Sequence, residues 1–380
     1  MKRIYLTLAL SSMMFMACAR QSMPGPPADP ANNNQPGVAS EGAANPGPVS
    51  ESRVFQGTIG ASNDLQMKLV RTGTELSGTY SYLKIGKPIT LKGTIDTSNS
   101  VQLSEYDAAG TLTGVFKGKW DATDSTAIRI EGNWSKPDST KQTKFSLTEQ
   151  PIAFSAGLEL TAKRLQVSED KLKCDIDVLY PQLSGSTDVR VARFNALVKG
   201  MIFKKISAFK KGLAEIAATE EEPPSDSDMR SDLNIGYTVG LANDDLISLG
   251  FEISGYSRGA AHPNSYSEVV NYDFKNGKTL KLADLFQPGS NYMKLISNYC
   301  LEDLKKQSKE QTLMADWIQR GAGPQAANYK SWTITRKGLD IIFDPYQVGP
   351  YAAGPQFVTV PYSFLKESIK ADGPLAPFVK

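Results

Sequence analysis

About eight short segments of alternating apolar and polar residues between Arg53 and Glu149 constrain the fold of this chain more than any other feature. Turns that mostly carry glycine separate them at intervals of about 8 to 12 residues. Alternation with a period of two predicts β-strands that bury one face, and this regular spacing is typical of a meander that closes into a barrel or a sandwich. We therefore expect an all-β domain over residues 53–150. The segments are Val54–Ile59, Leu65–Arg71, Leu76–Tyr82, Ile89–Ile95, Val101–Tyr106, Leu112–Trp120, Ala127–Trp134 and Lys144–Thr148.

The aromatic residues Tyr80, Tyr82, Trp120 and Trp134 in these segments allow two interpretations. They can fill the core of the domain, or they can line the mouth of a barrel that binds a ligand. Aromatic residues at alternating strand positions are more often part of the core, so we expect the core role.

A different pattern begins near residue 151 and predicts an α+β domain over residues 151–380. Apolar residues recur every three or four positions from Val191 to Ile216, as in an amphipathic helix, and a second such helix is expected over Asn291–Gln307. We expect one mixed or antiparallel sheet covered by these two helices. Its strands are predicted at Leu158–Gln166, Leu172–Tyr180, Leu233–Leu241, Leu246–Tyr256, Ser265–Phe274, Leu280–Leu282, Trp332–Thr335, Leu339–Phe343 and Phe357–Val360.

Two motifs in this second domain resemble a known family. The run from Gly259 to Asp284 contains the only histidine, His262, and continues into Leu285-Phe286. The segment from Phe343 to Gly354 reads FDPYQVGPYAAG. Both resemble the C-terminal domain of unknown function found in the lysozyme-responsive anti-sigma factor RsiV and in the non-catalytic part of PdaC-type envelope deacetylases. The resemblance covers residues 158–378.

The amino terminus resembles a bacterial lipoprotein signal over residues 1–18. A basic start precedes the apolar stretch Ile4–Met16, which is too short to span a bilayer as a helix, and Phe15-Met16-Ala17-Cys18 follows. This resemblance implies that Cys18 carries palmitate and anchors the chain in a lipid bilayer of the cell envelope, facing the periplasm from the outer membrane in a Gram-negative cell. The alternative is a plain secretory signal. Residues 19–52, rich in proline, glycine and asparagine, predict a flexible tether.

The other cysteines, Cys174 and Cys300, remain as an even pair once Cys18 is acylated. An oxidising compartment favours a disulfide between them, and we expect this bond. The alternative is two buried thiols, because cysteine is often buried unpaired.

The sequence contains no convincing set of catalytic or metal-binding residues. One histidine and three cysteines make a conventional zinc site improbable. The deacetylase domain of PdaC-type enzymes uses an Asp-His-His metal site, and we expect no such domain here. His262, Ser265 or Ser267, and Asp273 compose a triad only on paper, because no nucleophile elbow surrounds either serine. We therefore expect no catalytic residue, no metal and no cofactor.

The strongest candidates for recognition are two loops that mix proline and glycine with polar or aromatic residues. One is Asp344–Pro355 with Tyr346 and Tyr351, and the other is the turn with His262 and Asn264. Rigid aromatic side chains on shaped loops bind partners at a low cost in entropy. The alternatives are that the loop only covers the sheet, and that His262 bonds loop carbonyls.

The resemblance to the anti-sigma factor implies a binding module for lysozyme or a related muramidase. The alternatives are binding of peptidoglycan or another glycan, and a purely structural role in the envelope. Residues 151–380 hold 27 basic and 27 acidic side chains, so electrostatic steering toward a basic enzyme is weak. Lysines opposite the apolar stripe of the first helix are expected to face solvent, so we expect no nucleic acid as a partner.

Overall fold

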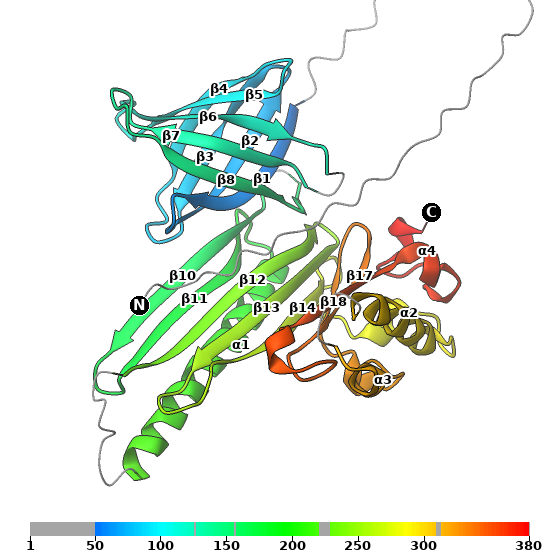
Figure 1. The fold of residues 1–380 in the computed structure, drawn as a ribbon. Coiled ribbons are helices and arrows are strands. Elements are labelled where there is room, and N and C mark those ends of the chain that lie inside the picture. The colour runs from blue at the N-terminus through cyan, green and yellow to red at the C-terminus, as the bar shows by residue number, and fades with distance from the viewer. Residues whose placement is uncertain (1–49, 125–126, 156, 220–228, 309–312, 380) are drawn as a thin grey trace, which may run out of the picture. The chain divides into compact units, whose positions relative to one another are not determined.

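The structure is a computed structural model of the 380-residue chain. It describes residues 50–379, except for 125–126, 156, 220–228 and 309–312 (Figure 1). The predicted lipoprotein signal with Cys18, and the predicted tether up to residue 49, lie outside the described residues. Within the described part of the chain, no helix is both long enough and apolar enough to cross a membrane.

The first eight strands form a closed antiparallel barrel, because β1 pairs with β8 as well as with β2 (Figure 1). Each strand contains or overlaps one predicted segment, so the all-β prediction is confirmed and the barrel alternative applies. The strands are β1 Ser50–Ile59, β2 Asn63–Thr72, β3 Glu75–Tyr82, β4 Ile89–Ile95, β5 Ser100–Tyr106, β6 Leu112–Asp121, β7 Arg129–Ser135 and β8 Thr143–Gln150.

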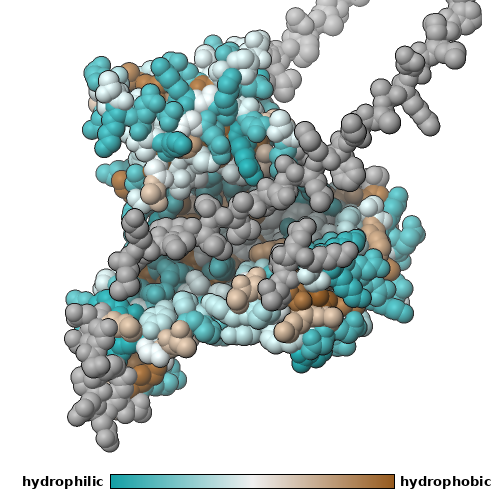
Figure 2. All heavy atoms as spheres, in the orientation of Figure 1, coloured by the Kyte–Doolittle hydropathy of each residue, from teal (hydrophilic) through white to brown (hydrophobic). Residues whose placement is uncertain are grey.

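The alternating side chains of the barrel separate into an apolar interior and a polar exterior. Tyr80 and Trp120 are buried, and the partly buried Tyr82 and Trp134 pack against the same core, so the core interpretation is confirmed. The barrel surface that faces the viewer in Figure 2 is mostly hydrophilic. Glycine is needed where strands approach closely, since a Cβ atom on Gly57 would lie 1.9 Å from the carbonyl oxygen of Ser146.

Two carboxylates of the barrel strands, Glu105 and Glu149, are buried. Glu105 is 5% exposed and accepts hydrogen bonds from the Tyr80 hydroxyl at 2.6 Å, from Trp134 Nε1 at 2.9 Å and from Thr113 Oγ1 at 2.8 Å. Burial of the phenol, followed by its hydrogen bond to Glu105, raises the pKa of Tyr80. The three donors compensate the carboxylate for lost water, as a buried charge requires.

The second part of the chain is α+β and contains a mixed sheet of seven strands in the order β10-β11-β12-β13-β14-β15, with β9 paired to β12. The pair β11–β12 is parallel, as is the short pair β12–β9, and the remaining pairs are antiparallel. The strands are β9 Ile152–Ala153, β10 Glu159–Glu169, β11 Cys174–Ser184, β12 Ser231–Asn243, β13 Leu246–Tyr256, β14 Asn264–Asp273 and β15 Lys278–Thr279.

Helix α1, Val189–Thr219, covers one face of this sheet (Figure 1). Its buried residues Phe194, Val198 and Ile202 share a core with strand residues of β11 to β14. Two lysines that were expected to face solvent instead form ion pairs with carboxylates of the strands. Lys205 pairs with Glu268, and Lys210 lies 2.5 Å from Glu169.

The last three strands form a sheet of their own, so the prediction of one sheet for the whole domain is wrong. These strands are β16 Trp332–Ile334, β17 Gly338–Phe343 and β18 Gln356–Pro361. Strand β16 lies against the second face of the large sheet instead of joining its edge. The Ile334 N–H donates to Ser248 Oγ at 2.7 Å, and a Cβ atom on Gly240 would lie 2.6 Å from the Ile334 carbonyl oxygen.

Helix α2, Tyr292–Gln307, was predicted and packs on the core of the small sheet. Helices α3 Ala315–Gly321 and α4 Tyr362–Leu365 were not predicted, because a helix of one or two turns shows too little periodicity. The hairpin after β14 is also shorter than expected. It pairs back only at Lys278–Thr279, and the predicted strand residue Leu282 begins the 3-10 turn η1, Leu282–Leu285.

The predicted disulfide is absent. Cys174 and Cys300 are free and fully buried. Cys174 begins β11, whereas Cys300 lies on α2 in the core of the small sheet, so different elements hold the two thiols. Burial raises the pKa of the Cys300 thiol to about 12. The alternative of two buried thiols therefore describes this protein.

Candidate functional site

The two loops selected from the sequence meet in the structure. The His262 ring faces the Tyr351 ring with centroids 4.4 Å apart and planes inclined by 30°. The rings of Tyr346 and Tyr351 are 5.6 Å apart at 35°, and Tyr346 Oη lies 3.4 Å from His262 Nε2. We call His262, Tyr346 and Tyr351 the aromatic platform.

A network of hydrogen bonds fixes the loop Asp344–Pro355, which carries the two tyrosines and which we call the platform loop. Asp344 Oδ1 accepts the Ser267 N–H at 2.9 Å, which ties the loop to β14. The Gln347 N–H donates to the Asp344 carbonyl oxygen at 3.0 Å, and Gln347 Nε2 donates to the carbonyl oxygens of Gly321 and Asn328, each at 2.9 Å. The loop is therefore held from three sides.

This network holds Tyr346 in an unusual backbone conformation. Its φ angle is +71°, in the left-handed region that a bulky residue rarely adopts. Such strain persists only where surrounding contacts determine the backbone, and strained residues cluster at functional sites. The side chain is nevertheless 53% exposed, so the strain is not compensated by burial in a core.

Of the two residues predicted on the other loop, His262 belongs to the platform and Asn264 does not. His262 is exposed, and its Nδ1 lies 2.7 Å from the carbonyl oxygen of Pro263, so it bonds a loop carbonyl and also stacks in the platform. Asn264 is exposed and begins β14 opposite Gly255. Within the described part of the chain, no hydrogen bond joins the Asn264 side chain to the platform.

A polar pocket beside the platform was not found from the sequence. It has a volume of about 490 Å³ and is lined by residues of β14, of the segment before β16 and of the platform loop, among them Ser267, Glu268, Lys330, Asp344 and Gln347. Desolvation raises the pKa of Asp344, although its hydrogen bonds with Ser267 act in the opposite direction. The only sequence signal for this pocket is the pair Asp344-Pro345, which is typical of a turn and places Asp344 in its lining.

The structure does not assemble the triad considered from the sequence. Ser265 and Ser267 lie in the first half of β14 and Asp273 at its end, and the six to eight residues of extended strand between them span about 20 to 26 Å. Within the described ranges, no group of three or more His, Cys, Asp or Glu side chains is arranged to hold a metal ion. What the platform and its pocket offer is a surface for binding.

Comparison with known proteins shows what this region is similar to. Residues 283–363 match the family described as "Protein of unknown function (DUF3298)". This chain contains a DUF3298 domain. The matched residues run from η1 to α4 and include Tyr346 and Tyr351, whereas His262 precedes them.

Curated relatives match over part of their length. Peptidoglycan-N-acetylmuramic acid deacetylase PdaC of Bacillus subtilis is 24% identical over 178 residues, which are 47% of this chain and 36% of PdaC. Immunogenic protein MPB64 of Mycobacterium bovis is 28% identical over 105 residues, which are 28% of this chain and 44% of that protein. The chain thus spans less than half the length of these relatives.

Two crystal structures of DUF3298 family proteins are also similar. One, from Bacteroides fragilis, has a TM-score of 0.43 at 18% identity and covers 60% of this chain and 99% of its own. The other, from Pseudomonas aeruginosa, has a TM-score of 0.40 at 16% identity and covers 56% of this chain and 95% of its own.

Proposed function

We propose that this protein is a cell-envelope binding protein whose DUF3298-containing domain binds the glycan of peptidoglycan on the aromatic platform. The observation that carries this proposal is the platform itself. Three rings from two distant loops lie together, with Tyr346 exposed on a backbone that other contacts hold in place.

The geometry of the platform suits a sugar ring. The C–H groups on the face of a sugar pack on the face of an aromatic ring, and a ring that is already fixed loses little entropy on binding. The His262 and Tyr351 rings stack on each other, Tyr346 leans against Tyr351, and the 53% exposed side chain of Tyr346 offers ring surface to a sugar. A polar side chain of the adjoining pocket, such as Lys330, can bond sugar hydroxyl groups.

The similarity to PdaC supports the same ligand, since the name of that enzyme places its activity on the N-acetylmuramic acid of peptidoglycan. We propose the same ligand for this protein, but not the deacetylase activity of PdaC. The chain covers 36% of PdaC, and no catalytic constellation is assembled in the part of the chain that the structure describes, so we propose a binding role without catalysis. Acylation of Cys18 would keep this binding domain at a membrane beside the wall.

Lysozyme or a related muramidase is the second candidate partner. One observation favours it, because an exposed tyrosine on a rigid loop is the kind of residue that dominates protein interfaces. The balanced charge of residues 151–380 offers no steering toward a basic enzyme, and we therefore rank the glycan first.

Titration calorimetry distinguishes these partners. Peptide-free glycan chains and hen lysozyme are titrated separately into the mature protein, into Tyr351→Ala and into Phe203→Ala. Phe203 is 48% exposed on α1 and serves as the matched aromatic control. We expect glycan binding that Tyr351→Ala weakens about thirtyfold and Phe203→Ala leaves unchanged. Binding of lysozyme alone would replace the first candidate with the second.

A further inference from the structure

Strand β15 covers only the end of the β14 edge of the large sheet, because it pairs with Tyr272 and Asp273 alone. Neighbouring residues of an antiparallel strand direct their backbone groups to opposite sides, and the odd-numbered residues of β14 point away from β13. Ser267 and Asn271 show this direction. The Ser267 N–H donates to Asp344 Oδ1, the Ser267 carbonyl accepts from Ser331 Oγ at 3.3 Å, and the Asn271 carbonyl accepts from the Leu280 N–H at 2.8 Å.

Val269 lies between these two residues and has the same direction. Among the hydrogen bonds of the described residues, none satisfies the outward N–H or C=O of Val269. An unpaired donor and acceptor on a strand edge form a template for one more extended backbone.

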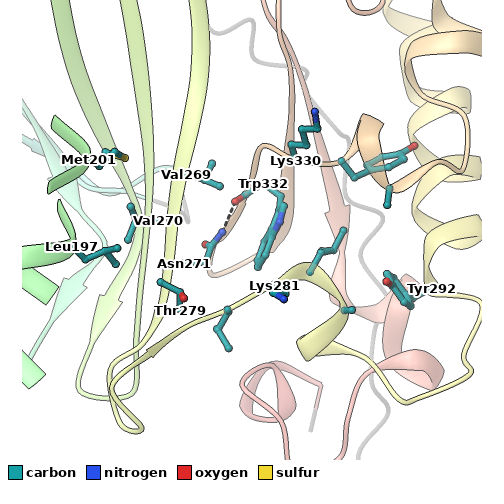
Figure 3. Close-up of a pocket in the computed structure, with 15 residues that line it drawn as sticks. Leu197, Met201, Val269, Val270, Asn271, Thr279, Lys281, Tyr292, Lys330 and Trp332 are labelled. Atoms are coloured by element: carbon teal, nitrogen blue, oxygen red, sulfur yellow. Dashed lines mark hydrogen bonds between the residues drawn. The ribbon is translucent and has the colours of Figure 1, made fainter. Parts of the chain in front are cut away.

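Two pockets meet at Val269. One is the polar pocket, and the other is a pocket of about 540 Å³ that we call the apolar pocket (Figure 3). Both pockets are lined by Val269 and Lys330. The apolar pocket is bounded by α1 through Leu197 and Met201 and by β16 through Trp332, which Figure 3 shows on the other side of β14.

The charges around Val269 favour an anion in the apolar pocket. Its lining contains two charged side chains, Lys281 and Lys330, and no acidic one. Neither lysine forms an ion pair with any residue in the described ranges. The carboxylates of the polar pocket already have partners, since Glu268 pairs with Lys205 and Asp344 accepts the Ser267 N–H.

We propose that the edge of β14 at Val269 binds the short peptide that peptidoglycan carries on its glycan. This inference rests on the proposed function and names a second subsite of the same surface. One extended residue of the peptide donates its N–H to the Val269 carbonyl oxygen and accepts the Val269 N–H on its own carbonyl oxygen. A small apolar side chain of the peptide enters the apolar pocket, and a carboxylate lies against Lys281 and Lys330. Asp344 and Gln347 of the platform loop line the polar pocket between the two subsites.

The backbone donor can be removed by substitution. Val269→Pro lacks the N–H, and proline is tolerated on an edge strand where that group faces away from the sheet. Val269→Ala keeps the N–H, and Ser265→Pro removes an outward N–H of the same strand at a residue that lines neither pocket. We titrate a synthetic stem peptide with an acetylated amino terminus and expect Val269→Pro to bind it about tenfold more weakly than Val269→Ala does, whereas Ser265→Pro should bind it like the parent.

The lysines are tested in the same way. Lys281→Gln and Lys330→Gln should each weaken the binding of the peptide about fivefold or more and reduce its dependence on salt, since a hydrogen-bonded charge contact is lost. Lys278→Gln is the control, because Lys278 is exposed on β15 and lines neither pocket. Melting temperatures of all variants separate lost contacts from lost folding.

Peptide-free glycan distinguishes failure of this inference from failure of the proposed function. Glycan binding without peptide binding, or equal peptide affinity of the parent and a folded Val269→Pro, would overturn the peptide subsite and leave the glycan platform standing. No binding of either ligand would overturn both. A dimer in sedimentation that Val269→Pro dissociates would assign the edge to a second copy of the chain and likewise overturn the peptide.

Discussion

The carboxylate of Asp344 accepts the backbone N–H of Ser267 at 2.9 Å, although 77 positions separate the two residues. This hydrogen bond joins the loop of the aromatic platform to the edge strand that carries Val269. Asp344 is half-buried, and desolvation raises its pKa. The stability of this connection between the two subsites therefore depends on pH.

Asp344→Asn should reduce this pH dependence. Desolvation raises the pKa of Asp344 in the folded state, so the folded state disfavours the charged form. The contribution of Asp344 to the free energy of unfolding is therefore largest below about pH 3.9, the unfolded value, and decreases as the pH rises through the folded pKa. Asparagine keeps the acceptor without the charge. Thermal unfolding of both proteins between acidic and neutral pH should show the variant gaining stability relative to the parent as the pH rises.

Asp344→Ala provides the contrast, because it removes the acceptor and leaves the Ser267 N–H without a partner. We expect the free energy of unfolding to decrease by about 1 to 3 kcal/mol, together with weaker glycan binding. An alanine variant as stable as the parent would show that the hydrogen bond does not fix the loop.

Tyr346→Gly should separate stability from binding. Glycine adopts φ angles near +71° without strain, so we expect the melting temperature to stay near that of the parent or to rise. Loss of the ring should weaken glycan binding about thirtyfold. Tyr346→Phe retains the ring and loses only the contact of its hydroxyl with His262, so it should bind within a few-fold of the parent. Calorimetry and thermal unfolding measured side by side decide between these outcomes.

Glu105→Ala should strongly destabilise the barrel. The substitution leaves Tyr80, Thr113 and Trp134 without the acceptor that they share, and we expect a loss of about 3 kcal/mol or more in the free energy of unfolding. Glu75→Ala, at an exposed position of β3, is the control and should change it by less than about 0.5 kcal/mol. Urea unfolding followed by tryptophan fluorescence measures both, and equal stabilities would assign Glu105 no structural role.

The thiols of Cys174 and Cys300 should react with a thiol reagent only when the protein is unfolded. Both side chains are fully buried, and the pKa of about 12 keeps Cys300 protonated at neutral pH. Mass spectrometry after labelling in denaturant without reductant should find both residues modified. A reductant should leave the melting temperature unchanged, whereas a decrease would reveal a disulfide.

Cys18→Ser tests the proposed lipid anchor. The parent should partition into the detergent phase with the mass of an acylated mature chain, and the variant should remain in the aqueous phase or accumulate as precursor. A variant that enters the detergent phase at its mature mass would contradict acylation at this residue.

The sequence predicted elements of the fold well where a local pattern determines them. Period-two alternation located all eight barrel strands, and the apolar stripe located α1, because burial of one face depends only on neighbouring residues. The choice of sheet for β16 was not predictable in the same way. Alternation shows that a strand buries a face, but contacts such as Ile334 with Ser248 decide which sheet it meets.

The candidate site shows the same limit. Residue types identified His262, Tyr346 and Tyr351 as contact residues, but their packing depends on the Asp344–Ser267 hydrogen bond between distant segments. The free backbone of Val269 has no sequence signal, because it arises from the shortness of β15. The disulfide prediction failed because an even count of cysteines carries no information about the distance between them.

The closure of β1 against β8 brings the two ends of the barrel segment together. Val54 and Gln150 are partners across this seam, and paired residues of antiparallel strands lie about 5 Å apart. The chain therefore enters and leaves the barrel at nearly one point. A genetic deletion of residues 54–150 would therefore join two chain ends that are already neighbours, without lengthening the connection that the barrel interrupts.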